Sequence, residues 1–169
     1  MEQLQRYLNH SKIDVVFKQN KDDFVVTEIP LYEFSGDGEH LVLKIRKKDL
    51  ATWDAIEILA RYLNCSSREF GYAGLKDKNA LTVQSISIHR KYEEQLKSFQ
   101  HENIKILETT YHNNKIKVGH LKGNKFFIRL KRVGAIEKRK IEEALGQIVT
   151  YGIPNYFGFQ RFGIDGDNY

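Results

Sequence analysis

The spacing of apolar residues changes several times along the chain, and each change marks an expected element. Residues 41–46 read Leu-Val-Leu-Lys-Ile-Arg, an apolar run interrupted by charges, which is typical of a strand. From Thr52 to Leu63 the period becomes helical, and one face of that helix is formed by Trp53, Ile56, Ala60 and Leu63. Thr52 is placed to cap this helix, and Asp54 suits its first turn.

Strand-like segments lie on both sides of this helix. Residues 17–34 read as two strand-like runs around a polar turn at Asn20–Asp22, and residues 81–90 alternate isoleucine with serine. Residues 103–133 give three more β-like segments. Residues 136–149 are helical, and Gly152 and Pro154 follow in the order expected at a helix C-terminus. Strands in clusters between single helices predict an α+β fold without an internal linker.

Composition and charge narrow the class of protein. The 169 residues carry 27 Lys+Arg against 22 Asp+Glu, a net charge of +5 that is compatible with a polyanionic partner. Cys65 is the only cysteine, and the six histidines lack metal-site spacing, so we expect neither a disulfide nor a metal site. No stretch resembles a signal peptide or a membrane span, which indicates a cytoplasmic protein.

The stretch GYAGLKDKNALTVQ at residues 71–84 is the first candidate for chemistry. It lacks the second glycine and the Ser or Thr of a phosphate-binding loop, so its glycines do not indicate a nucleotide site. It does place Asp77 between Lys76 and Lys78, directly after a glycine-rich strand end. These lysines, or one from elsewhere, can hold the carboxylate ionised and usable as a nucleophile. A solvated turn is the alternative interpretation.

The stretch LKGNKFFIRL at residues 121–130 is the second candidate. Asn124 can hydrogen-bond to a base edge, and Phe126 can stack on a base. Alternation with Ile128 and Leu130 instead favours a core position for Phe126, and Phe24 has the same ambiguity. Lys18 reads by default as a surface lysine.

Three stretches together resemble the TruD family of tRNA pseudouridine synthases. They are KQNKDDFVVTEI at Lys18–Ile29, the GYAGLKDK stretch, and LKGNKFF followed by PNYFGFQRFG at Pro154–Gly163. The resemblance covers nearly the whole chain. It implies isomerisation of uridine to pseudouridine in tRNA, at position 13 in the bacterial members, without cofactor or metal.

The resemblance also implies roles for particular residues. Asp77 matches the catalytic aspartate of the family, and Lys18 matches the basic residue that pairs with it. Phe24 and Asn124 match residues that contact the substrate, and Phe126 matches the aromatic that stacks on the target base. Lysines on the surrounding strands would bind phosphates, namely Lys44, Lys115, Lys117, Lys122 and Lys131. The sequence leaves open whether Asp77 attacks the base, attacks the sugar or removes a proton from the sugar.

Length is where the sequence departs from the family, whose members are about twice as long. Residues 1–169 are expected to be the N-terminal part of the catalytic domain, with a pseudouridine-synthase-like, largely antiparallel sheet that is incomplete. An incomplete sheet favours self-association or pairing with the missing half. We therefore expect this chain alone to bind tRNA weakly and to isomerise it poorly or not at all.

Two alternatives to an isomerase stay open. A non-catalytic RNA-binding module would keep the fold and lack activity. A small protein-interaction domain with incidental charge would show no salt-dependent affinity for tRNA.

Overall fold

The computed structural model describes residues 7, 8 and 10–154, and the chain divides into two compact units. The larger unit is Phe17–Leu130, and the smaller combines Met1–Val16 with Lys131–Tyr169. Two short strands, β1 (Val16–Phe17) and β8 (Leu130–Lys131), pair with each other where the chain passes between the units. The NYFGFQRFG part of the family resemblance falls at residues 155–163, outside the described residues.

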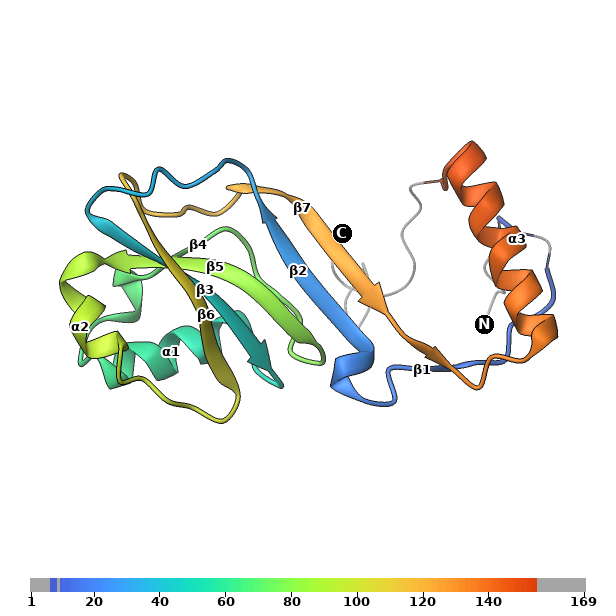
Figure 1. Ribbon diagram of the computed structural model, residues 1–169, viewed down its shortest axis with the longest axis horizontal. Helices are drawn as coiled ribbons and strands as arrows, with labels where there is room; N and C mark the ends of the chain where they lie inside the picture. The colour runs from blue at the N-terminus through green and yellow to red at the C-terminus, as the bar shows by residue number, and fades with distance from the viewer. Residues whose placement is uncertain (1–6, 9, 155–169) are drawn as a thin grey trace, which may run out of the picture. The chain divides into compact units, whose positions relative to one another are not determined.

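The larger unit is built on a six-stranded mixed sheet. Its strands are β2 (Phe24–Pro30), β3 (His40–Lys48), β4 (Gly71–Tyr72), β5 (Leu81–His89), β6 (Ile104–His112) and β7 (Leu121–Ile128). They run in the order β6-β3-β5-β2-β7, with β4 beside β5. Only β2 and β5 pair in parallel, and every other pair is antiparallel. The predicted α+β class with a mainly antiparallel sheet is confirmed (Figure 1).

Helix α1 (Thr52–Tyr62) covers one face of the centre of this sheet (Figure 1). Alternate residues of β3 and β5 point toward the helix and pack against Ile56 and Leu59. Those strand residues are Leu41, Leu43, Ile45, Ile86 and Ile88, each no more than 1% exposed. Burying one such aliphatic side chain stabilises the fold by roughly 1.5–3 kcal/mol, so this cluster anchors the unit.

Two expectations for α1 are wrong in detail. Trp53 is 45% exposed, because the buried face of the helix is formed by Ala55, Ile56, Leu59, Ala60 and Leu63. Thr52 is not the N-cap: Ala51 holds that position, and the hydroxyl of Thr52 bonds elsewhere. Asp54 does act in the first turn, where its carboxylate accepts the main-chain N–H of Ala51 at 2.9 Å.

The opposite face of β5 is covered by the segment that joins β6 to β7. Val42, Ala73 and Ile116 form a small buried cluster there, and the hydroxyl of Ser87 accepts the N–H of Ile116 at 2.9 Å. A side chain at Gly71 would collide with the carbonyl oxygen of Ile116 and with the hydroxyl of Ser87. The first glycine of the GYAG motif is therefore required for close packing.

The smaller unit contains α3 (Ala135–Tyr151), which confirms the helix expected at residues 136–149. It ends at Gly152, whose φ of 74° is a conformation that favours glycine. In the larger unit, one four-residue helix, α2 (Glu93–Leu96), was not predicted. No helix of the described residues is both long and apolar enough to cross a bilayer.

Candidate active site

The pairing of β2 with β7 brings the predicted substrate-contacting residues to one face of the sheet. In the register, Phe24 is opposite Ile128, Val26 opposite Phe126, and Glu28 opposite Asn124. Directly opposed residues of an antiparallel pair point to the same face, so an aromatic and an amide stand in one row on β7. Thr82 of β5 is opposite both Val26 and Lys47, and Lys47 lies in the row of β3 residues that face α1. The row on β7 is therefore on the same face of the sheet that α1 covers.

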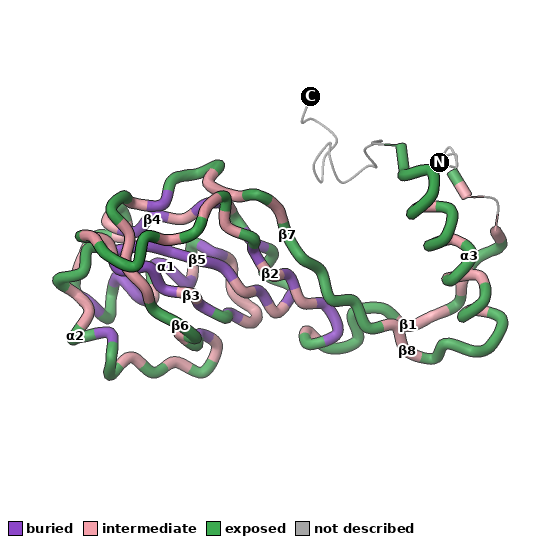
Figure 2. The backbone as a smooth tube through the Cα atoms, turned by 45° about the horizontal axis from the view of Figure 1, so that its top comes forward, coloured by how far each residue is buried: buried purple, intermediate pink, exposed green. Residues whose placement is uncertain are grey.

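Phe126 is exposed, and its predicted core position is wrong. Its side chain is 56% exposed, because β7 is an edge strand and the residues that pack on α1 come from β3, β5 and β6. Figure 2 shows exposed backbone along β7 beside the alternately buried β2. An exposed phenylalanine beside an exposed asparagine is an arrangement that can receive a flat, polar-edged ring.

Lys18, Phe24 and Phe126 lie together. The rings of Phe24 and Phe126 are 6.1 Å apart, and the ammonium of Lys18 lies 3.8 Å from the centroid of Phe24. Phe24 is nearly buried, with a second ring, Phe17, edge-on at 5.7 Å. Lys18 has a φ of 55°, uncommon for a residue with a side chain. Among the described residues, Lys18 makes cation–π contacts with Phe17 and Phe24 and forms no ion pair.

The turn between Lys18 and Phe24 is held by Asp23. One carboxylate oxygen of Asp23 accepts the N–H of Asn20 at 2.9 Å, and the other lies 3.6 Å from the guanidinium of Arg129. The main-chain carbonyl of Asp23 accepts the N–H of Arg129 at 2.8 Å. Asp23 is 1% exposed, so this buried carboxylate ties the turn to the end of β7.

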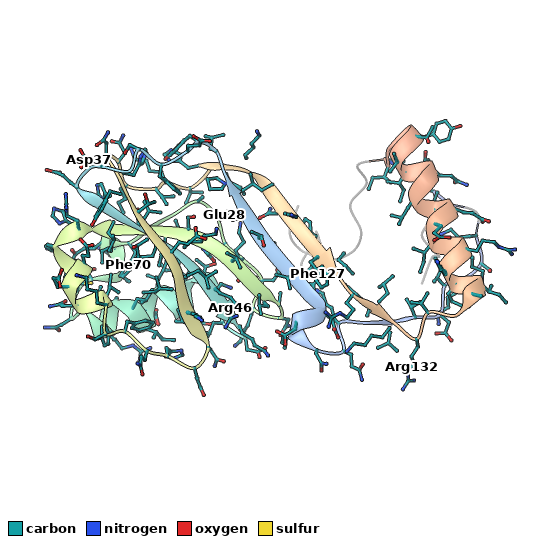
Figure 3. All side chains as sticks on the ribbon, in the orientation of Figure 1. Glu28, Asp37, Arg46, Phe70, Phe127 and Arg132 are labelled. Atoms are coloured by element: carbon teal, nitrogen blue, oxygen red, sulfur yellow. The ribbon has the colours of Figure 1, made fainter. Side chains whose placement is uncertain are left out.

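Asp77 lies in the loop that joins β4 to β5, and the residue before it anchors that loop. The ammonium of Lys76 forms a buried ion pair with Glu28 at 3.0 Å, in which the two side chains are 5% and 2% exposed. Glu28 is labelled on β2 in Figure 3. Its other oxygen accepts the N–H of Ser85 at 3.2 Å. Lys76 is thus paired with Glu28 and does not supply the cation expected beside Asp77.

A second anchor comes from α1. The main-chain N–H of Lys76 donates to the hydroxyl of Thr52 at 2.9 Å, and that hydroxyl donates to the side-chain oxygen of Gln84 at 3.0 Å. Thr52 and Gln84 are both 1% exposed. The first residue of α1 therefore fixes the loop to β5, and its hydroxyl bonds outside its own helix.

Lys47 provides the third anchor, from inside the sheet. Its ammonium lies 2.6 Å from the carbonyl oxygen of Leu50, 3.2 Å from that of Asp77 and 3.4 Å from that of Lys76. Burial lowers the pKa of Lys47 to about 8, an effect that the negative charges of Asp77 and Asp54 oppose. A buried cation therefore lies beneath the main chain of the candidate catalytic residue.

The side chain of Asp77 itself is exposed. Within the described part of the chain it forms no ion pair, with Lys18 or with any other residue. Lys78 and Asn79 beside it are exposed as well. The structure thus places the carboxylate on an open loop whose main chain is anchored from below. The catalytic role of Asp77, and its pairing with Lys18, stay predictions.

The lysines expected to bind phosphates have mixed surroundings. Lys44 pairs with Glu108 at 3.1 Å, and Lys115 donates to the carbonyl of Arg68 at 2.6 Å, so both already have protein partners. Lys117 and Lys122 are exposed. Among the described residues, no three His, Cys, Asp or Glu side chains group closely enough to hold a metal ion.

Sequence reasoning missed Lys47, Glu28 and Thr52. A signal for Lys47 was present, because it continues the inward alternation of Leu41, Leu43 and Ile45 on β3. Glu28 likewise follows Phe24 and Val26 on the inward side of β2. A charged residue at an inward position of a strand needs a buried partner, and that requirement points to a site.

Comparisons with known proteins identify the group to which these features are related. The chain matches the family model for tRNA pseudouridine synthase D (TruD) over residues 3–168. It is 57% identical over 162 residues to a protein of Sulfurimonas denitrificans named tRNA pseudouridine synthase D, covering 96% of this chain and 45% of the relative. It is 58% identical over 163 residues to the protein of the same name from Wolinella succinogenes, with the same coverage of both chains.

A solved structure gives the same result for the fold. The crystal structure of a putative tRNA pseudouridine synthase D from Methanosarcina mazei superimposes with a TM-score of 0.81 at 29% identity. The match covers 92% of this chain and 36% of that one. The chain therefore spans less than half the length of the relatives that it matches.

Proposed function

Because this chain belongs to the TruD family of tRNA pseudouridine synthases, we propose that it takes part in the isomerisation of uridine to pseudouridine in tRNA, with Asp77 as the catalytic carboxylate. The observation that carries the proposal is the anchored loop. Buried contacts of Lys76 and Lys47 fix its main chain, yet the carboxylate of Asp77 remains accessible. A loop that only turned the chain would not need a buried ion pair beneath it.

The reaction requires an anionic group and the exchange of protons, and the residues of this site can supply the anion. The glycosidic bond from N1 to the ribose breaks, the uracil turns, and C5 bonds to the ribose in its place. The proton at C5 is released and N1 takes one up, so atoms and electrons balance without an oxidant. The chemistry needs an anion that attacks the nucleoside or removes a sugar proton, which is the role of Asp77.

The target uridine must leave its stack to reach Asp77, at a cost of a few kcal/mol. Phe126 would offset part of this cost, since stacking of a base on an aromatic side chain contributes roughly 1–3 kcal/mol. Asn124 would hydrogen-bond to the edge of the flipped base, and Phe24, with Lys18 above its ring, would support Phe126 from behind. Exposed lysines such as Lys122 would hold phosphates and fix position without reading sequence.

The substrate would be position 13 of tRNA, as in the bacterial members of the family, and the place of action the cytoplasm. Residues 1–169 would form the N-terminal part of the catalytic domain. Because they cover about 45% of the length of the relatives, we expect weak tRNA binding and poor turnover from this chain alone.

The test uses a hybrid protein in which this chain replaces the matching 162 residues of the Sulfurimonas denitrificans relative. Tritium release from tRNA labelled at uridine C5 measures turnover by the hybrid, by the unaltered relative and by the chain alone. We expect release by the hybrid and little by the chain. A hybrid that binds tRNA as tightly as the relative but releases no tritium contradicts the proposal.

A non-catalytic tRNA-binding module is the second candidate, and the open position of Asp77 favours it. The carboxylate of Asp77 is exposed to solvent, and hydration lowers the reactivity of an anionic nucleophile. This candidate predicts that the hybrid binds tRNA in a salt-dependent manner and forms no pseudouridine.

A further inference from the structure

The burial of the Lys47 side chain in the larger unit requires a physical explanation. It is 0% exposed and stands in the row of inward residues that otherwise forms the apolar core against α1. An ammonium group is costly to bury unless its donors are satisfied. A leucine or methionine at this position would pack without that cost.

The buried ammonium of Lys47 is surrounded by main-chain carbonyl oxygens from two segments of the chain. A protonated lysine has three N–H donors, and its ammonium has three carbonyl oxygens within 3.4 Å. One belongs to Leu50, before α1, and the other two belong to Lys76 and Asp77. The side chain therefore joins β3, the approach to α1 and the main chain of the proposed catalytic residue at one point.

The charges around Lys47 agree with this arrangement. The carboxylates of Asp77 and Asp54 raise the pKa of Lys47 against the larger effect of burial, and the ammonium of Lys76 lowers it. Asp77 is thus close enough to interact electrostatically with Lys47, although its side chain reaches the surface.

Other lysines near the loop have other partners. Lys76 pairs with Glu28, and Lys18 lies over the ring of Phe24. Lys78 is exposed. Within the described part of the chain, Lys47 is the lysine whose ammonium bonds to residue 77 itself.

We propose that Lys47 is a positioning residue for catalysis: its buried ammonium fixes the main chain of Lys76 and Asp77 and presents positive charge beneath the Asp77 carboxylate. The inference rests on the proposed role of Asp77. It assigns to a residue inside the sheet the role that the family resemblance implies for Lys18.

The first test is amide hydrogen exchange in the 169-residue chain, with Lys47→Met against the matched control Lys44→Met. The N–H of Lys76 reports on the loop, because it donates to Thr52. The main-chain N–H groups of Leu43 and Ile86, two buried residues, report on the core. We expect Lys47→Met to lower protection of the Lys76 amide by about tenfold or more while core protection holds or rises. Lys44→Met should leave the loop unchanged, because the Lys44 side chain is 41% exposed and pairs with Glu108.

A lysine that serves the fold alone gives a different result. In that case Lys47→Met lowers loop and core protection by the same factor, or leaves the loop as it was, and the proposal is overturned. Should Lys47→Met fail to fold, Lys47→Gln takes its place, because an amide keeps two N–H donors but carries no charge. Protection of the Lys76 amide should again fall more than protection of the core. Equal loss from loop and core, or no loss from the loop, overturns the proposal.

Activity of the hybrid protein separates this inference from the proposed function. We expect Lys47→Met to lower kcat by about tenfold and to change KM by less than about twofold, because the lost interaction orients a reacting group and does not bind tRNA. Full activity in Lys47→Met with none in Asp77→Asn overturns the positioning role alone. Full activity in Asp77→Asn overturns the catalytic role of Asp77, and the positioning role with it.

Discussion

The ammonium of Lys47 on β3 donates a hydrogen bond to the main-chain carbonyl oxygen of Asp77, 30 positions later in the chain, over 3.2 Å. The contact joins a central strand of the core to the loop that carries the candidate catalytic carboxylate. It also makes part of the stability of the larger unit depend on the protonation of one buried lysine.

That dependence has a defined sign. The pKa of Lys47 is lowered from 10.5 to about 8, so between these values the unfolded chain binds the proton and the folded chain does not. Stability therefore rises with pH across this window, by at most about 3 kcal/mol at about 1.4 kcal/mol per pKa unit. Urea unfolding of the unaltered chain and of Lys47→Met from pH 7.5 to 10.5 measures it, because other groups cancel in the difference. A difference that stays flat or falls with pH contradicts the assignment.

The buried pair of Lys76 and Glu28 should be costly to break on one side. Glu28→Gln leaves the Lys76 ammonium buried without its counter-charge, and we expect a loss of about 3–5 kcal/mol in unfolding free energy. The control is Glu108→Gln, which breaks an exposed pair with Lys44 and should cost less than about 1 kcal/mol. Urea unfolding compares the two, and equal losses would show that Glu28 is not needed beneath the loop.

Two adjacent phenylalanines on β7 provide an internal comparison. Phe126 faces the same side as Phe24 and Asn124, whereas Phe127 is opposite Val25 and points to the other face, with similar exposure (56% and 51%). Figure 3 labels Phe127 on this strand. In the hybrid protein, Phe126→Ala should lower kcat/KM by the factor that corresponds to a loss of roughly 1–3 kcal/mol in base stacking. Phe127→Ala should change kcat/KM little. A larger loss of kcat/KM in Phe127→Ala than in Phe126→Ala would show that the base stacks on the opposite face of β7.

The first glycine of the GYAG motif should tolerate no side chain. Gly71→Ala puts a methyl group against the carbonyl of Ile116 and the hydroxyl of Ser87, and we expect a loss of about 1–3 kcal/mol from the displaced segment. Gly123→Ala on β7 is the matched control, since a methyl group there meets no atom within 4 Å. Thermal or urea unfolding of both variants decides, and equal stabilities would show that the close approach at Gly71 is not needed.

The sequence predicted those parts of the fold that local periodicity determines. The helices near residues 52–63 and 136–149 and the main strands are where their patterns placed them. The four-residue α2 was missed because one turn carries too few positions to show a period. The core position that alternation favours for Phe126 is wrong, because alternation shows that a strand has two faces but not that β7 lies at the edge of the sheet, away from the residues that pack on α1.

The residues of the candidate site also fall into those that the sequence indicated and those that only the structure revealed. Phe24, Asn124 and Phe126 were proposed as substrate contacts through resemblance, and pairing of β2 with β7 brings them to one face of the sheet. The residues beneath the loop come from three separate elements, so no local pattern connects them. Lys47 and Glu28 carried a readable signal, since each places a charge at an inward position, but their partners become known only when the strands are assembled.

The central claim is that the Asp77 carboxylate performs chemistry and does not merely bind tRNA. The most direct measurement is single-turnover tritium release, together with tRNA affinity, for the hybrid carrying Asp77→Asn and for a control carrying Asp37→Asn, in the turn before β3. We predict that Asp77→Asn lowers the rate by at least about a hundredfold, equivalent to about 2.7 kcal/mol, while tRNA affinity changes little. A rate for Asp77→Asn equal to that of the control would contradict the account.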